Sequence, residues 1–128
     1  MEDISYTYSE TSPVVDSDPD DLIVNLDGFE GPLDVLLTLA KSQKVDLMKI
    51  SILQLTEQYL EFIAKVRDRN LELAADYLVM AAWMAFLKSH LLIPREETGE
   101  ELSAEEMAER LKFQLKKLEA IRQVSQKL

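Results

Sequence analysis

The stretch of residues 76–91, which reads DYLVMAAWMAFLKSHL, decides how this chain folds. Its residues 77–87 are eleven consecutive positions without a charge, and apolar side chains fall on every side of a helical wheel. A helix on the surface of a lone soluble domain normally has one apolar stripe and one polar face. We therefore predict a helix that is N-capped by Asn70, runs to about Leu92, and must be covered on all sides by its own chain or by another protein.

Three further helices are predicted around this segment, so the fold class is all-α, a small bundle of about four helices. They span residues 31–44, 51–69 and 103–127. Pro32 suits a first helical position, because its missing N–H would have no helical partner there. Ser51 and Ser103 each precede a Gln or Glu by three residues, which is the capping-box pattern at a helix start.

Composition divides the chain into three segments. Residues 1–20 are rich in Ser, Thr, Asp and Pro without a period, which predicts a disordered acidic tail. Residues 22–26 place Leu22, Val24 and Leu26 on one face of a short strand, which must lie on the helices or join the edge of a partner's sheet. We assign residues 21–94 to a helical domain and residues 95–128 to a charged hinge followed by a single helix.

The net charge of −10 is distributed unevenly. Residues 1–40 hold ten acids and no base, whereas residues 41–128 hold fourteen of each. Since no basic patch dominates, tight direct binding of DNA is not expected. The absence of cysteine excludes disulfides and fits a reducing compartment. We see neither a signal-peptide pattern nor an apolar run of the roughly 18 residues that span a membrane, and so expect a cytoplasmic protein.

Catalytic and metal-binding chemistry has little support in the sequence. His90 is the only histidine, with no second ligand at zinc spacing, and the three glycines form no phosphate-binding loop. Asp27, Glu30 and Asp34 cluster at a helix start and could serve a small acidic hydrolase, but helix capping and the helix dipole explain them more simply. We expect no enzyme activity, no cofactor and no metal.

The predicted helix at residues 103–127 carries an apolar seam with spacings of three and four. Its members are Met107, Leu111, Leu115, Leu118 and Ile121. The seam can pack back on the bundle or serve a partner, and the sequence leaves both open. The basic C-terminal half also permits an amphipathic helix on a membrane surface, but seven acids at residues 96–109 count against that.

The helix at residues 70–92 also allows two interpretations. It can be the central helix of the bundle, but two neighbouring helices cannot easily cover all of its sides. It can instead join the helices of a partner. Methionine suits adaptable contact surfaces, and Trp and Tyr are enriched among residues that dominate interface energies.

Ordered motifs in this chain resemble those of a known family. Residues 29–37, FEGPLDVLL, resemble the FEGPLDLLL signature of segregation and condensation protein A, the bacterial kleisin. Residues 58–60, QYL, resemble its second-helix motif, and residues 77–94 contain YLVMAA, KS and LLIP, which resemble its (F/Y)LVMAA…KS..LLP segment. The likeness covers residues 22–94, and residues 103–128 resemble the start of the family's middle region more loosely.

The resemblance implies a scaffold in chromosome condensation and segregation, cytoplasmic and associated with the nucleoid. Kleisins bridge the two heads of a structural-maintenance-of-chromosomes (SMC) dimer and reach DNA only through that complex. Their N-terminal domain forms a helical bundle with the coiled-coil neck of one SMC subunit. Their middle region binds a dimer of segregation and condensation protein B, and a C-terminal winged helix binds the other head.

The resemblance also implies contact residues, carried over by position. The neck is expected to contact Leu73, Tyr77, Met80, Trp83, Met84, Leu87 and Leu91. Protein B is expected to contact the seam, which is Met107, Leu111, Leu115, Leu118 and Ile121.

Chains of this family are much longer, so we expect a piece of the N-terminal half that binds one neck. The sequence leaves open whether this piece self-associates when the partner is missing, which an exposed apolar face would encourage. The alternative is a generic helical adaptor domain for protein partners.

Overall fold

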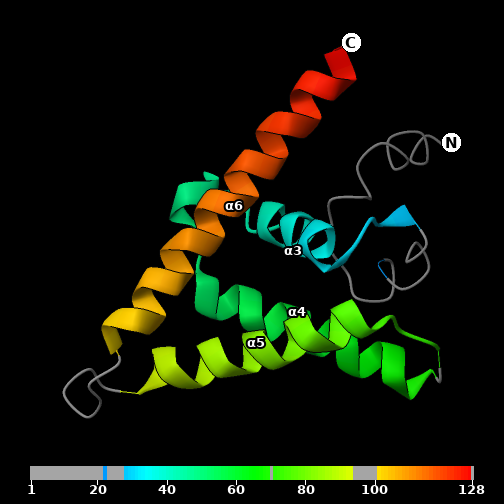
Figure 1. Cartoon of the computed structure of the whole chain (residues 1–128), viewed down its shortest axis with the longest axis vertical. Coiled ribbons are helices and arrows are strands. Elements are labelled where there is room, and N and C mark those ends of the chain that lie inside the picture. Colours follow the sequence, from blue (N-terminus) through cyan, green and yellow to red (C-terminus); the bar gives the residue numbers. More distant parts are fainter. Residues whose placement is uncertain (1–21, 23–27, 70, 94–100, 128) are drawn as a thin grey trace, which may run out of the picture.

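The computed structural model describes residue 22 and residues 28–69, 71–93 and 101–127. These residues form four α-helices and one 3-10 helix (Figure 1), namely α3 (Pro32–Lys41), η3 (Leu47–Lys49), α4 (Ile52–Asp68), α5 (Ala75–Leu92) and α6 (Glu101–Lys127). The prediction of an all-α fold with about four helices is confirmed. The predicted tail lies outside the described residues, and so does the predicted strand except for Leu22, whose side chain is buried.

The helices form two packed groups that share one core. Helices α4 and α5 run side by side in opposite directions (Figure 1), and they make the most extensive helix–helix contact of the described chain. Helix α6 packs against α5, η3 and α3, and its C-terminal end extends past the other helices. The segment predicted to follow a hinge therefore packs on the bundle in this structure.

The core is built from the apolar faces that the helical period predicts. On α4 the buried apolar residues include five at helical spacing, which are Leu55, Tyr59, Phe62, Ile63 and Val66. Leu36 on α3 and Leu111 on α6 are fully buried in the same cluster. The hydroxyl of Tyr59 donates a hydrogen bond of 3.0 Å to the carbonyl oxygen of Tyr77, so α4 and α5 are also joined by a buried polar contact.

Local sequence signals fix the starts of α3 and α4. Gly31 precedes α3 with φ 157° and ψ −178°, a conformation that L-residues rarely adopt, and Pro32 follows it as the first helical residue. The hydroxyl of Ser51 accepts a hydrogen bond of 3.0 Å from the backbone N–H of Gln54. The predicted N-cap of α4 is thus confirmed.

Two predicted helix starts are wrong. Helix α5 begins at Ala75 rather than after Asn70, and its N-cap, Ala74, makes no side-chain hydrogen bond. Residues 71–74 are not helical and lead from α4 into the antiparallel α5 (Figure 1). Helix α6 begins at Glu101, so Ser103 lies inside it rather than at its cap.

Candidate functional site

The face of α5 that points toward α4 belongs to the core. Three of the residues predicted to contact an SMC neck, Tyr77, Met84 and Leu87, are buried there. The other four, which are Leu73, Met80, Trp83 and Leu91, are partly buried and pack against the core from its edge. Apart from Leu73, which precedes α5, the predicted residues thus lie on one side of α5, and this is the side that the chain itself largely covers.

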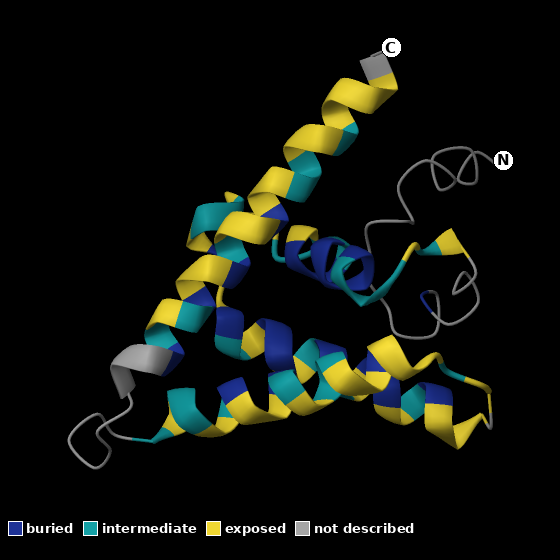
Figure 2. Cartoon of the chain, viewed as in Figure 1, coloured by how far each residue is buried: buried dark blue, intermediate teal, exposed yellow. Residues whose placement is uncertain are grey.

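The opposite side of α5 is apolar and uncovered. We call it the outer face of α5 and define it by Leu78, Val79, Ala82 and Phe86. The exposed fractions are 49% for Leu78, 69% for Val79 and 41% for Phe86, and Figure 2 shows exposed positions along the length of the helix. The expectation that this helix carries more apolar surface than its chain covers is confirmed. Such continuous exposed apolar surface is characteristic of interaction sites.

Sequence reasoning missed the residues of the outer face. A segment that is apolar on every side has no period, so the sequence gives no signal that separates the buried side from the exposed one. The family resemblance places Tyr77 and Met84 among the partner contacts, and in the structure these residues fill the core. The packing of α4, α6 and α3 against α5 decides which side of α5 remains open.

A hollow of about 350 Å³ borders the outer face near the start of α5. Asp76, Val79, Met80 and Trp83 line it. Its lining is mostly apolar with one carboxylate at the edge, so it can receive an apolar side chain of a partner. Met80 and Trp83 of the predicted set thus join the outer face through this hollow.

His90 lies beside the outer face of α5. Its ring lies 4.0 Å from the ring of Phe86, measured between centroids, and its Nδ1 lies 3.0 Å from the carbonyl oxygen of Phe86. In the described part of the chain, no three His, Cys, Asp or Glu residues are grouped so that they could hold a metal ion.

The inward side of α6 consists of residues spaced by four and three. Ala104, Ala108, Leu111 and Leu115 are buried, and Leu118 and Met107 are partly buried against the core. Of the residues predicted to contact protein B, Leu111 and Leu115 are therefore covered by this chain. Ile121 is 54% exposed, and the neighbouring Arg122 turns inward instead.

Two ion pairs join α6 to α3, and we call them the α3–α6 ion pairs. Arg122 Nη1 lies 2.6 Å from Oδ1 of the buried Asp34, and Lys41 Nζ lies 3.1 Å from Glu119 Oε2. The hydrogen bond to Asp34 raises the pKa of Arg122, although burial acts in the opposite direction. The other oxygen of Asp34 accepts a hydrogen bond of 3.0 Å from the backbone N–H of Glu30.

The contacts of Asp34 explain one member of the acidic cluster predicted at the start of α3. The carboxylate of Asp34 is held on one oxygen by a guanidinium and on the other by a backbone N–H, so its role is structural. Asp27, the third member of the cluster, lies outside the described residues.

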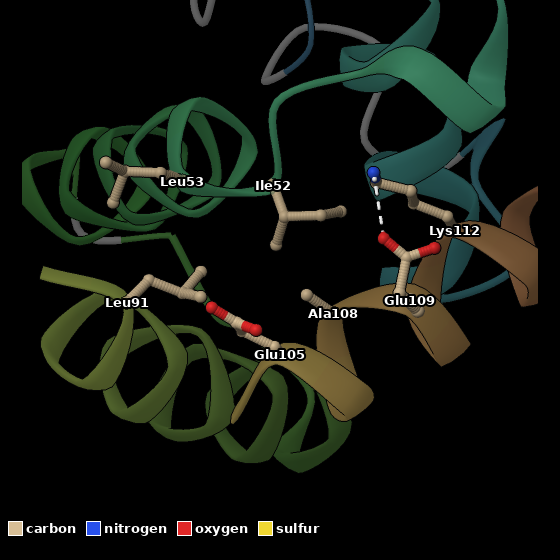
Figure 3. A pocket seen from close by; sticks show the side chains of 7 residues that line it. All are labelled: Ile52, Leu53, Leu91, Glu105, Ala108, Glu109 and Lys112. Carbon is tan, nitrogen blue, oxygen red and sulfur yellow. Dashed lines mark hydrogen bonds and ion pairs between the residues drawn. The ribbon is translucent and has the colours of Figure 1, made fainter. Parts of the chain in front are cut away.

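A groove of about 400 Å³ lies where the start of α4, the end of α5 and the start of α6 meet (Figure 3). Ile52 and Ala108 point into it. The ion pair between Lys112 Nζ and Glu109 Oε2, at 3.2 Å, lies at one edge. Four of the seven residues that line the groove are apolar and three are charged, so the groove offers a mostly apolar contact surface with a charged edge.

The helices of the described chain are not long and apolar enough to cross a membrane.

Comparison with known proteins identifies the family. The family model described as Segregation and condensation protein ScpA matches residues 39–128. Segregation and condensation protein A of Coxiella burnetii is 48% identical over 91 residues, which cover 71% of this chain and 34% of that protein. The protein of the same name from Xylella fastidiosa (strain 9a5c) is 40% identical over 110 residues, or 86% of this chain and 36% of the relative. That from Mycoplasmopsis pulmonis is 38% identical over 104 residues, or 81% and 41%.

The chain thus spans a little over a third of the length of the curated relatives that it matches. The names of these relatives describe chromosome segregation and condensation and not a catalysed reaction, in agreement with a site that consists of apolar surface. The matched family model covers most of the residues whose helices and exposed faces are described above, and the chain belongs to the segregation and condensation protein A family.

Proposed function

We propose that this chain is part of a non-enzymatic kleisin subunit of a bacterial SMC complex, and that it binds the coiled-coil neck of an SMC protein through the outer face of α5. The observation that carries the proposal is the exposed apolar surface of Leu78, Val79 and Phe86 on a helix whose other side fills the core. The proposed setting is chromosome condensation and segregation, in the cytoplasm and at the nucleoid, with DNA contacted only through the complex.

The shape of this surface suits a helical partner. A regular helix presents ridges of side chains that pack into the grooves of neighbouring helices, so the outer face of α5 can add the two helices of a coiled coil to the α4–α5 pair. Fully burying a Val, Leu or Phe side chain contributes about 1.5–3 kcal/mol. Because the three side chains are only partly exposed, their burial supplies part of the free energy of a specific contact, and Met80 and Trp83 are proposed to add to it against the cost of association.

The neck contacts predicted from the family resemblance fall into an accessible group and a buried group. Met80 and Trp83 border the outer face and are proposed as partner contacts together with Leu78, Val79 and Phe86. Contact of the neck with the buried Tyr77, Met84 and Leu87 remains a prediction that requires α5 to turn or to separate from α4.

Binding of a protein B dimer by α6 is the second part of the proposal. It is supported by the resemblance of residues 103–128 to the start of the family's middle region. Of the seam residues proposed for this contact, Ile121 is accessible while α6 stays packed, whereas Leu111 and Leu115 are accessible only after α6 leaves the bundle.

Val79→Glu tests the first part. Val79 is 69% exposed, so the substitution leaves the core intact, and it places a charge in the middle of the proposed contact. We expect the dissociation constant for a purified SMC neck fragment to rise by at least about ten-fold, measured by calorimetry. Ala64→Glu, on the exposed side of α4, adds the same charge elsewhere and is expected to bind like the parent.

Equal binding by the parent and by a folded Val79→Glu variant would show that the outer face of α5 is not the contact.

We also expect the unpartnered chain to self-associate with rising concentration, because the exposed apolar surface is then free to meet another copy. Val79→Glu should reduce this association in sedimentation experiments.

A further inference from the structure

Helix α6 has an exposed side that carries its charges in a definite order. Exposed residues recur along it at spacings of three or four, with two lysines sharing one position, so they lie on one side of the helix. We call them the outer strip of α6, which consists of Glu106, Glu109, Phe113, Lys116, Lys117, Ala120 and Val124. The strip lies opposite Leu111 and Leu115, which are buried against the bundle. Figure 2 shows exposed positions along α6, so the strip is accessible while the helix stays packed.

The order along the outer strip is acid, apolar, base. Glu106 and Glu109 come before Phe113, and Lys116 and Lys117 come after it. The side chain of Phe113 is 67% exposed, although it is one of the largest apolar groups of the chain. The strip therefore has an apolar centre between two short segments of opposite charge.

Three further charged residues border the strip. Glu105 and Lys112 lie at the edge of the groove in Figure 3, and Arg110 lies on the other side of Phe113. Lys112 Nζ pairs with Glu109 Oε2 at 3.2 Å, but the side chain of Glu109 is still 63% exposed and can meet a second cation. Because both signs of charge surround Phe113, neither the phosphates of a nucleic acid nor an anionic membrane surface suits the strip.

A strip with this order of charges is complementary to a copy of itself. When two such helices lie antiparallel about a two-fold axis near Phe113, the acids of each copy meet the lysines of the other, and the two phenyl rings meet at the centre. In a parallel pair, like charges would meet instead. The 27 residues of α6 span about 40 Å, and the C-terminal end of the helix extends past the other helices (Figure 1). Most of the strip is thus open to a second helix.

We propose that two copies of this chain associate through the outer strips of α6, in an antiparallel and two-fold symmetric contact. The contact is distinct from association through the outer face of α5. It involves neither an SMC neck nor protein B, so it goes beyond the proposed function. Since surface ion pairs are individually weak and are screened by salt, the dimer forms at high protein concentration and dissociates as the salt concentration rises.

Charge-reversal variants of the whole chain test the contact in sedimentation experiments over a range of concentrations. Every protein, the parent included, carries Val79→Glu, which suppresses association through the outer face of α5. One variant adds Glu106→Lys with Glu109→Lys, and the other adds Lys116→Glu with Lys117→Glu. We expect each variant alone to dimerise at least about ten-fold more weakly than the parent, because like charges then meet across the axis. An equimolar mixture of the two variants should dimerise as strongly as the parent, since opposite charges meet again.

Phe113→Gln provides a second test that leaves all charges in place. The side chain is exposed, so the core is unchanged, and we expect dimerisation to weaken at least about ten-fold. Ile121→Gln is the matched control, because Ile121 is 54% exposed on the same helix but lies outside the strip. It should dimerise like the parent, and both variants should unfold at the parent's midpoint.

Four results would overturn the proposal. The first is a parent that stays monomeric at every concentration, and the second is dimerisation that both reversal variants retain in full. The third is a mixture of the reversal variants that does not recover the lost association, because an antiparallel contact requires recovery. The fourth is equal dimerisation of Phe113→Gln and Ile121→Gln, which decides the matter even if a reversal variant fails to fold.

Discussion

Gly31 controls the start of α3 through its backbone alone. A Cβ added there would meet no atom within 4 Å, but the φ of 157° is a conformation that side-chain-bearing residues rarely adopt. Gly31→Ala is therefore expected to lower the free energy of unfolding by about 1–3 kcal/mol, in denaturant titrations. Gly28→Ala is the matched control, because Gly28 also has open space but no left-handed φ. If the two variants lose the same stability, backbone strain at Gly31 is not the cause.

Tyr59 makes stability depend on pH in the alkaline range. Its ring is fully buried, and burial, followed by the nearby Tyr77, raises the pKa of Tyr59 far above its ordinary value. Burial also raises the pKa of Tyr77, with Asp34 and Asp76 as further causes. The unfolded chain releases these protons near about pH 10, whereas the folded chain retains them. The stabilising contribution is therefore complete below about pH 10 and is lost as the pH rises above it.

For Tyr59 the free energy of unfolding is expected to fall by up to about 1.4 kcal/mol per pH unit above about pH 10. Unfolding titrations from about pH 8 to about pH 11 measure it. Tyr59→Phe removes the ionising hydroxyl, so the free energy of unfolding should decline less steeply above about pH 10. The variant should also be less stable at neutral pH, because the carbonyl oxygen of Tyr77 loses its hydrogen-bond donor. Parallel curves for the parent and this variant would exclude Tyr59 as the source.

The residue pair Asp34–Arg122 explains one error of the sequence analysis. Helical spacing alone allows Ile121 to continue the inward seam, and hydrophobicity favours it. A buried carboxylate on α3 requires a cation, however, and Arg122 supplies it. Because adjacent positions on a helix point about 100° apart, Ile121 then faces outward. No pattern within α6 predicts this, since the requirement comes from a residue far away in the sequence.

At the scale of elements, α6 is expected to be part of the cooperative fold rather than a separate arm. Leu115 is fully buried between α6 and the bundle. Leu115→Ala should therefore lower the free energy of unfolding of the whole chain by about 2–5 kcal/mol. Ile121→Ala, on the exposed side of the same helix, should change it by about 0.5 kcal/mol or less.

Hydrogen exchange provides the second measurement for α6. The backbone amides around Leu111 and Leu115 should exchange at rates similar to those of buried α4 amides, because they open only when the shared core opens. Fast exchange along α6 with protection retained in α4 would show that α6 detaches independently.

The elements differ in how far their sequences predict them. Helix α4 is amphipathic, so its period gives the buried side and its Ser51 cap gives the start. Helix α5 is apolar all round, so its existence is predictable but its orientation is not. The start of α5 at Ala75 depends on the reversal after α4, and capping propensity at Asn70 gives no information on that reversal.

At the scale of the whole molecule, the sequence predicts the fold class, the four helices and the family. It also predicts that a helix in this chain has apolar surface left over. The division of each helix into a buried and an open side arises only when the helices pack, because α5 and α6 each carry apolar residues on two sides. The sequence therefore predicts correctly that the candidate site lies on α5. It does not predict that Val79 is exposed and Met84 is buried, because this depends on how the helices pack.

The attachment of α6 along α3 has a geometric consequence for any assembly built on this chain. Each residue of a helix adds about 1.5 Å of length and about 100° of rotation. One residue inserted into α6 between the buried Leu115 and the exposed Val124 would turn everything beyond it toward another direction in space, while the composition stays almost the same. Two partners bound to α5 and α6 would then be wrongly oriented relative to each other. Insertions and deletions in α6 should therefore impair such an assembly more than most substitutions of single side chains.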